Sequence, residues 1–394
     1  MSGKNKTQTT ENLQFRYLYG FGILFVVLSH CDSGGLTMLS NWMNFGAFHL
    51  AIFVFGSGYF FRSEKLEHPL EYLGQKVKKL LVPLWLWNLF YGLALLVMKR
   101  CGFTFGEPFN LRNLLLFPIN SENLYVLNLG SWFVFPFFMV QFLYAAGKLL
   151  SDRLGKPVVT GRILQLLFIA AGLTGVYLAG HGYHESNLYP IFRILYFMPF
   201  YAGGMLYRDF LEKSYQKAPS WICLGSCLLI SLLLNTRFGR TVYAIPASCD
   251  YPFGVAATYL AGFVGILFWL KVSQMLAEGF ELCKPMAVLG RSTWEIMIHQ
   301  FAGILAVKCF FAGCNRLFGW FADFDWNAFF GDIWYLYRPG GVQEYAFCYV
   351  LGAVGVPLLI KWLLGKGKER YKKERCEKVR RQTASGREAH GNKS

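Results

Sequence analysis

Long apolar runs, separated by short polar or basic stretches, follow one another along this 394-residue chain. A helix that crosses a membrane needs about 20 mainly apolar residues. The runs that approach this length are Phe15–Cys31, Trp42–Phe61, Leu80–Met98, Ser131–Leu150, Ile163–Gly180, Leu188–Tyr207, Ser220–Asn235, Tyr251–Leu270, Thr293–Phe311 and Tyr345–Leu364. The pattern therefore predicts an all-α fold, a polytopic transmembrane bundle of about ten helices.

The segment Leu111–Leu127 is less apolar than these runs and contains Pro118. Because proline interrupts a helix, we expect an interfacial or re-entrant piece here. No long polar stretch separates the apolar runs, so a single membrane domain is expected over residues 15–365. An N-terminal tail (residues 1–14) and a basic C-terminal tail (residues 366–394) flank it, and both are predicted to be cytoplasmic.

Composition supports a membrane protein. The chain is 54% hydrophobic and only 16% charged, whereas a soluble domain carries about a quarter charged residues. A net charge of +16 would suggest nucleic-acid binding in a soluble protein. Here the basic residues lie between the apolar runs and in the last thirty residues, so we expect contact with anionic membrane lipid and no nucleic-acid partner.

The placement of lysine and arginine predicts the orientation. With ten spans, 30 of the 39 basic residues fall on one side, as the positive-inside rule requires of the cytoplasmic side. The other nine are Lys99, Arg100, Arg112, Arg193, Arg237, Arg240, Lys308, Arg316 and Arg338. An even number of helices then places both chain ends in the cytoplasm.

Ionisable side chains inside a membrane are costly and are therefore candidates for function. His30 lies at the outer end of the first run and is followed by Cys31 and Asp32. It could be a general base whose tautomer the neighbouring carboxylate holds. It could equally be a boundary histidine that bonds to lipid headgroups or loop backbone, and the sequence leaves both alternatives open.

Other membrane-embedded polar residues have simpler interpretations. Glu295 and His299 are four residues apart, so they share a helix face and could form a hydrogen bond, either to orient a catalytic group or to neutralise each other. His49 fits a packing histidine. Arg193 and Lys308 fit either snorkelling or pairing with a carboxylate.

A second cluster lies on the predicted cytoplasmic side. Lys76, Lys78 and Lys79 directly precede the third run and could anchor the helix or bind the phosphates of a soluble donor such as an acyl-coenzyme A. Arg16 lies fourteen residues before His30, roughly 21 Å along a helix, a distance that an extended pantetheine arm could bridge. Ten scattered cysteines form no CxxC pair, so no metal site is predicted.

Six segments follow one another along the chain: Tyr19–His30 (YGFGILFVVLSH), Ala51–Arg62 (AIFVFGSGYFFR), Lys76–Trp87 (KVKKLLVPLWLW), Ser131–Phe133 (SWF), Tyr196–Tyr207 (YFMPFYAGGMLY) and Leu289–Gln300 (LGRSTWEIMIHQ). In this order they resemble the integral-membrane acyltransferase 3 family, the bacterial O-acetyltransferases of surface polysaccharides that include fucose 4-O-acetylase-like proteins. Each motif alone is common in apolar helices, and the specificity comes from their order.

The resemblance implies a membrane-bound O-acyltransferase of the bacterial plasma membrane that moves an acyl group, expected to be acetyl, from acyl-coenzyme A to a carbohydrate hydroxyl. The coenzyme is then a co-substrate and not a permanently bound cofactor, and the acceptor is a carbohydrate or a lipid-linked glycan. The implied catalytic residues are His30, as base, and Asp32, as its partner. The implied donor-binding residues are Arg16, Lys76 and Lys79, and Glu295 and His299 would support the pocket.

One position departs from the family pattern. Members commonly carry an arginine eleven residues before the histidine, where this chain has Tyr19. Arg16 lies three residues earlier on nearly the same helix face and is the predicted substitute. The basic residues before the third run are lysines, which bind phosphate as point charges and not as bidentate forks.

Two other classes of function fit the same pattern. A transporter or flippase for a glycan precursor would also contain broken helices and membrane histidines. A non-catalytic membrane scaffold would need neither a base nor a donor site. Catalytic dependence on His30, together with consumption of a thioester, separates the enzyme from both.

Overall fold

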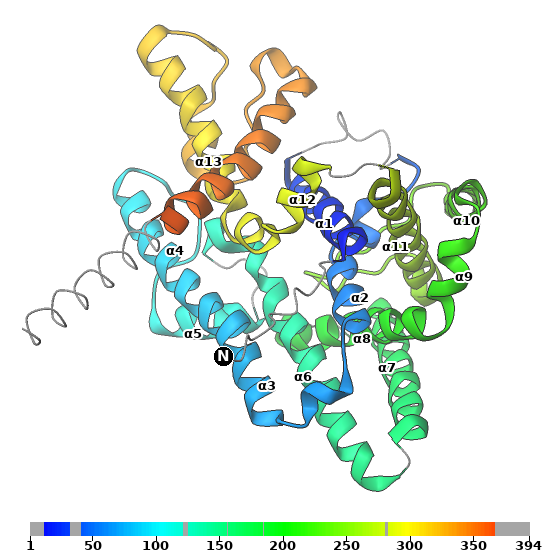
Figure 1. Ribbon diagram of the computed structural model, residues 1–394. Coiled ribbons are helices and arrows are strands. Elements are labelled where there is room, and N and C mark those ends of the chain that lie inside the picture. Colours follow the sequence, from blue (N-terminus) through cyan, green and yellow to red (C-terminus); the bar gives the residue numbers. More distant parts are fainter. Residues whose placement is uncertain are drawn as a thin grey trace, which may run out of the picture.

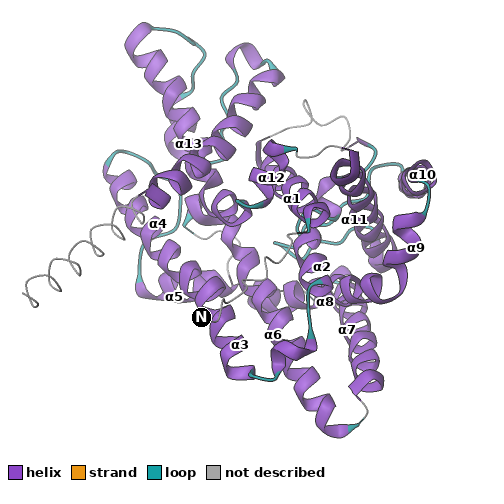
Figure 2. Ribbon diagram, viewed as in Figure 1, coloured by secondary structure: helices purple, strands orange, loops and turns teal. Residues whose placement is uncertain are grey.

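The structure is a computed structural model that describes residues 12–31, 41–120, 125–155, 157–183, 185–279 and 283–366. These residues form α-helices with short 3-10 and π-helical segments, and they contain no β-strand (Figure 2). The all-α prediction is therefore confirmed for the described part of the chain.

Seven described helical segments are long and apolar enough to cross a membrane: Pro69–Arg100, Val126–Leu154, Val159–Gly180, Ser220–Phe238, Gly254–Gly279, Thr293–Phe318 and Gln343–Lys366. Each overlaps one of the ten predicted runs. The chain is thus an all-helical membrane protein.

The remaining three predicted runs form the interior of the bundle. They correspond to α1 (Leu13–Cys31), α2 (Ala51–Tyr59) and α8 (Tyr189–Leu206). α1 lies in the middle of the molecule, beside α2, α11 (Gly254–Gly279) and α12 (Lys284–Gly290) (Figure 1). Because neighbouring helices bury most residues of these segments, they can carry buried polar residues such as Gln14, Arg16 and Arg193.

The predicted run Trp42–Phe61 is a regular α-helix only in its second half. Before α2, the chain forms a 3-10 turn, η2 (Phe45–Ala47), in which the Asn44 side chain accepts a hydrogen bond from the Gly46 N–H at 2.8 Å. The His49 ring bonds to the Phe45 carbonyl at 2.6 Å. Such irregular backbone is tolerated at membrane depth where protein covers it.

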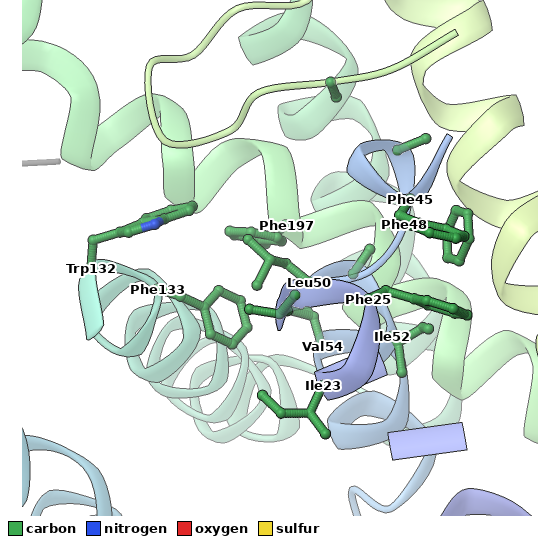
Figure 3. Packing of buried hydrophobic residues seen from close by; sticks show 14 of the residues in the cluster. Ile23, Phe25, Phe45, Phe48, Leu50, Ile52, Val54, Trp132, Phe133 and Phe197 are labelled. Atoms are coloured by element: carbon green, nitrogen blue, oxygen red, sulfur yellow. The ribbon is translucent and has the colours of Figure 1, made fainter. Parts of the chain in front are cut away.

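Aromatic packing covers this turn. Phe25 of α1 stacks on Phe45 with ring centroids 4.2 Å apart and meets Phe48 edge-on at 5.8 Å (Figure 3). Leu50 and Val54 lie in the same buried cluster, beside Phe133 and Phe197 in the view. The contact between α1 and the start of α2 is therefore part of the buried core.

The segment that contains Pro118 is not a spanning helix. It forms α5 (Leu111–Asn120), and from Val126 the chain enters a buried 3-10 helix, η5 (Val126–Phe133), that continues directly into α6 (Val134–Leu154). η5 packs on α13 (Thr293–Phe318). Gly130 permits this contact, since a Cβ there would lie 2.4 Å from the Met297 carbonyl oxygen.

A π-helical turn, η4 (Val77–Leu81), joins α3 (Pro69–Lys76) to α4 (Val82–Arg100). Pro83 has no N–H, so the Lys79 carbonyl lacks its usual partner in an α-helix. The wider turn, in which the Val82 N–H bonds to the Val77 carbonyl, accommodates this loss. The turn also determines which of the neighbouring lysines face the interior.

The other elements complete the bundle and its loops. They are η3 (Ser63–Leu66), α7 (Pro157–Gly180), η6 (Ser186–Leu188), η7 (Tyr207–Leu211), α9 (Glu212–Lys217), α10 (Ser220–Phe238), α14 (Trp326–Gly331), η8 (Pro339–Gly341) and η9 (Gln343–Tyr345). The last spanning helix, in Gln343–Lys366, lies against α13, where a Cβ on Gly303 would come within 2.2 Å of the Gly352 carbonyl oxygen.

Helices α2 and α8 cross at glycines. A Cβ on Gly58 would lie 2.0 Å from the Tyr201 carbonyl oxygen, and a Cβ on Gly204 would lie 1.9 Å from that of Phe55. Small residues let helix backbones approach closely inside membranes, where packing replaces the hydrophobic effect as the main cause of association. The crossing therefore has no room for a methyl group.

We predict that Gly204→Ala destabilises the protein by roughly 1 to 3 kcal/mol, because the added methyl must push the two backbones apart. The measurement is the thermal unfolding midpoint of detergent-purified protein. Gly225→Ala on α10 is the matched control, since nothing lies within 4 Å of its Cβ position. An unchanged midpoint for Gly204→Ala would contradict this account of the crossing.

Candidate functional site

A cavity of about 480 Å³ lies between α1, α2, η4, α6 and α13. Three lysines line it at one end: Lys65, Lys76 and Lys79. Its other lining residues are mostly apolar or aromatic: Tyr19, Ile23, Val26, Leu50, Phe53, Ser57, Phe60, Phe61, Tyr72, Gln75, Leu80, Phe133, Val134, Phe137, Gln141, Tyr201, Thr293, Trp294 and Met297. The cavity thus combines a basic mouth with apolar walls.

The packing of α1 against α2 shows which residues lie at each end of the cavity. Phe15 stacks on Tyr59 with ring centroids 4.2 Å apart, so the start of α1 and the end of α2 lie at the same level as the lysines that follow. Val26 and Leu50 lie at the opposite end, since they occupy the later part of α1 and the residue before α2. The cavity therefore runs along the middle of α1, from Tyr19 to Val26.

The lysines at the mouth have neutral partners. The Lys76 ammonium donates to Gln141 Oε1 at 2.5 Å and lies 5.5 Å from the centre of the Tyr72 ring. The Lys65 ammonium donates to the Phe60 carbonyl at 3.5 Å. Because an amide and a carbonyl do not neutralise an ammonium group, the mouth remains positively charged and can attract an anion. Lys78, in the same π-turn, is exposed and is not among the lining residues.

His30 continues the stripe of α1 residues that lines the cavity. Tyr19, Ile23 and Val26 are spaced by four and three residues, and His30 follows after four more, about 6 Å further along the helix axis. Met297 lines the cavity on α13, and Gln300 follows one turn later. His30 and Gln300 therefore meet one turn beyond the end of the cavity.

The hydrogen bonds of Gln300 determine the tautomer of His30. The Gln300 side chain is fully buried, its Nε2 donates to the Met297 carbonyl at 3.3 Å, and its Oε1 lies 3.2 Å from His30 Nδ1. Because Oε1 can only accept, Nδ1 must carry the proton. The lone pair of the imidazole is then on Nε2, which is the atom able to take a proton from a substrate.

Two aromatic rings lie beside the imidazole. The His30 ring centroid lies 5.0 Å from that of Phe301 and 5.9 Å from that of Trp334. Asp32, the predicted partner of His30, lies outside the described residues. The partner that the structure provides is Gln300.

The predicted supporting residues have partners on other helices. Glu295 pairs with Lys361 at 3.2 Å, which links α13 to the last spanning helix. His299 Nδ1 lies 2.6 Å from the Tyr91 hydroxyl, and the ring centroids of His299 and Trp87 are 4.3 Å apart. These contacts link α13 to α4. Glu295 and His299 thus fix the position of α13, which carries Gln300.

The predicted donor-binding residues separate into two groups. Lys76 and Lys79 line the cavity, whereas Arg16 does not. Arg16 is only 5% exposed and packs against α12, where a Cβ on Gly290 would lie 2.0 Å from the Arg16 carbonyl oxygen. Tyr19, at the position where the family commonly has arginine, does line the cavity.

Four residues that the sequence pattern does not predict lie in or beside the site. These are Lys65, Gln141, Gln300 and Trp334. Gln300 directly follows His299 in the motif that resembles the family. Its position on that helix could therefore have been predicted from the sequence. Within the described ranges, no three His, Cys, Asp or Glu side chains gather closely enough to hold a metal ion.

No family model, curated protein or solved structure matches this chain.

Proposed function

We propose that the protein is a membrane-bound O-acyltransferase that moves an acyl group, acetyl in the simplest case, from acyl-coenzyme A to a hydroxyl of a cell-surface carbohydrate. One observation carries this proposal. Each of the six segments that resemble the acyltransferase 3 family contributes at least one residue to the lining of a single cavity, and the line of that cavity along α1 leads to His30. This shared lining by segments far apart in the sequence supports the proposal.

The cavity suits the donor in both charge and shape. Lys65, Lys76 and Lys79 would bind the phosphates of the coenzyme as point charges. The apolar and aromatic walls beyond them would enclose the pantetheine arm. From Tyr19 to His30 the α1 helix rises about 16 Å, which is the length over which the arm would extend.

His30 Nε2 would act as the general base. The acceptor hydroxyl would lose its proton to Nε2 while its oxygen attacks the carbonyl carbon of the thioester. The new C–O bond forms, the C–S bond breaks, and the imidazolium returns the proton to the departing sulfur. The products are an ester and free coenzyme A, so atoms and charge balance.

Gln300 would take the role for which Asp32 was predicted. Its Oε1 accepts from Nδ1–H, so it holds the imidazole in the tautomer that leaves Nε2 free. An amide supports the imidazolium less than a carboxylate does, but it adds no second charge to a buried site. Glu295 and His299 would act indirectly, by fixing α13.

The proposal includes the ten-span topology, with both ends of the chain in the cytoplasm of a bacterium. The positive-inside bias supports it, since 30 of the 39 basic residues then lie on one side. In this orientation the lysine mouth faces the compartment where acyl-coenzyme A is made, and His30 faces the outer surface, where the acceptor is exposed.

The topology predicts that reporters fused at Gly386 and within Ser63–Gln75 are on the same, cytoplasmic side of the plasma membrane. A reporter inserted at Gly340 should be on the outer side. The measurement is the activity of paired reporters that function on one side only. Opposite sides for Gly386 and Ser63–Gln75 would contradict the even number of spans.

The catalytic role predicts that His30→Ala and His30→Gln each lower the initial rate of acyl transfer by about a hundredfold or more, because a general base is lost. The assay follows labelled acetyl-coenzyme A into surface glycan in membranes with matched protein abundance. His181→Gln is the control, since this exposed histidine follows α7 and its ring bonds to the Tyr177 carbonyl at the end of that helix. Near-normal transfer by either His30 variant would reject the base and favour the transporter.

A further inference from the structure

Hydrogen bonds hold the segment that follows α13 close to His30. The Lys308 ammonium, fully buried on α13, donates to the Asp332 carbonyl at 2.7 Å and to the Ile333 carbonyl at 3.3 Å. The Trp334 N–H donates to Asp332 Oδ1 at 2.7 Å. The backbone immediately before Trp334 is therefore held from the same helix that carries Gln300.

The backbone after Trp334 is held as well. The Tyr349 hydroxyl donates to the Tyr337 carbonyl at 2.8 Å, and Arg338 Nη2 donates to the Cys31 carbonyl at 3.4 Å, one residue beyond His30. The Tyr337 hydroxyl donates to the Asp323 carboxylate, a bond that holds the pKa of Asp323 below its ordinary value. The segment is thus tied to the end of α1 and to the last spanning helix.

Trp334 is half exposed in spite of these constraints. Its side chain is 51% exposed, although its ring centroid lies 5.9 Å from that of His30 and 5.4 Å from that of Phe301. The Phe301 ring meets it at 86°, so it supports the indole edge-on and does not cover it by stacking. A rigid indole with open surface beside a candidate base has the form of a binding platform.

From this geometry we infer that Trp334 is the stacking platform of the acceptor subsite and that the acceptor group bound there is a pyranose ring. A pyranose presents a face of C–H bonds that can pack on an indole, while its hydroxyls project from the rim. On this platform, a rim hydroxyl would point toward His30 Nε2. The inference rests on the proposed function. It adds where the sugar binds and which residue its ring packs on.

An interfacial tryptophan that only anchors the protein at the membrane surface is the competing role. Trp320 provides the matched control, because it lies in the same outer segment, is 58% exposed, and has Phe318 and Phe321 as its described ring neighbours. Loss of an anchoring indole should affect both positions equally. Loss of a platform should affect only Trp334.

The experiment uses membrane vesicles from a deletion strain that carries wild type, Trp334→Ala, Trp334→Phe or Trp320→Ala at matched abundance. The initial rate of label transfer from acetyl-coenzyme A into the glycan fraction is measured, and the affinity of each purified variant for coenzyme A is measured in parallel. We expect Trp334→Ala to lose about tenfold in rate or more, and Trp334→Phe to stay within about threefold of wild type. Trp320→Ala should match wild type, and coenzyme A affinity should be unchanged throughout.

The outcomes separate the two proposals. If wild-type vesicles transfer no more label than vesicles of the deletion strain, the acyltransferase function fails and the platform fails with it. If wild type is active, the platform alone is overturned by a wild-type rate for Trp334→Ala, by an equal loss for Trp320→Ala, or by weakened coenzyme A binding that accompanies the Trp334→Ala loss.

Discussion

The hydrogen bond between His30 and Gln300 joins the two helices on which the candidate site depends. α1 carries the stripe that lines the cavity, and α13 carries Met297 at the end of the cavity and Phe301 beside the imidazole. A buried polar group must find a partner, and both side chains here satisfy that requirement through each other. The same bond links α1 to α13 and fixes the tautomer of the histidine, so one interaction serves both the packing and the proposed chemistry.

Burial inside a membrane protein explains which parts of the fold were predictable. Apolar run length identified the seven segments long enough to span, because each of them contains a continuous helical window of high hydropathy. It was least informative for α2 and the turn before it. There Asn44 and His49 satisfy the backbone locally, and surrounding helices, which no local pattern reveals, cover the irregular segment.

The site was predictable in its anchor residues and not in its pairings. His30, Lys76 and Lys79 stood out because charge and imidazole are rare in apolar runs. The partner of His30 lies 270 residues away in the sequence, and the partner of Glu295 lies on the last helix. Spacing along one helix favoured the pairs His30–Asp32 and Glu295–His299. Asp32 falls outside the described residues, and Glu295 and His299 bond to other helices.

In the proposed enzyme, the lysine mouth and the cavity behind it hold an acyl-coenzyme A directed at His30. The most direct test is the affinity of purified protein for coenzyme A in wild type, in Lys76→Gln/Lys79→Gln and in the control Lys78→Gln, whose lysine shares the π-turn but does not line the cavity. We expect weaker binding for the double variant and wild-type binding for Lys78→Gln. Equal affinity in all three proteins, or an equal loss in both variants, would contradict it.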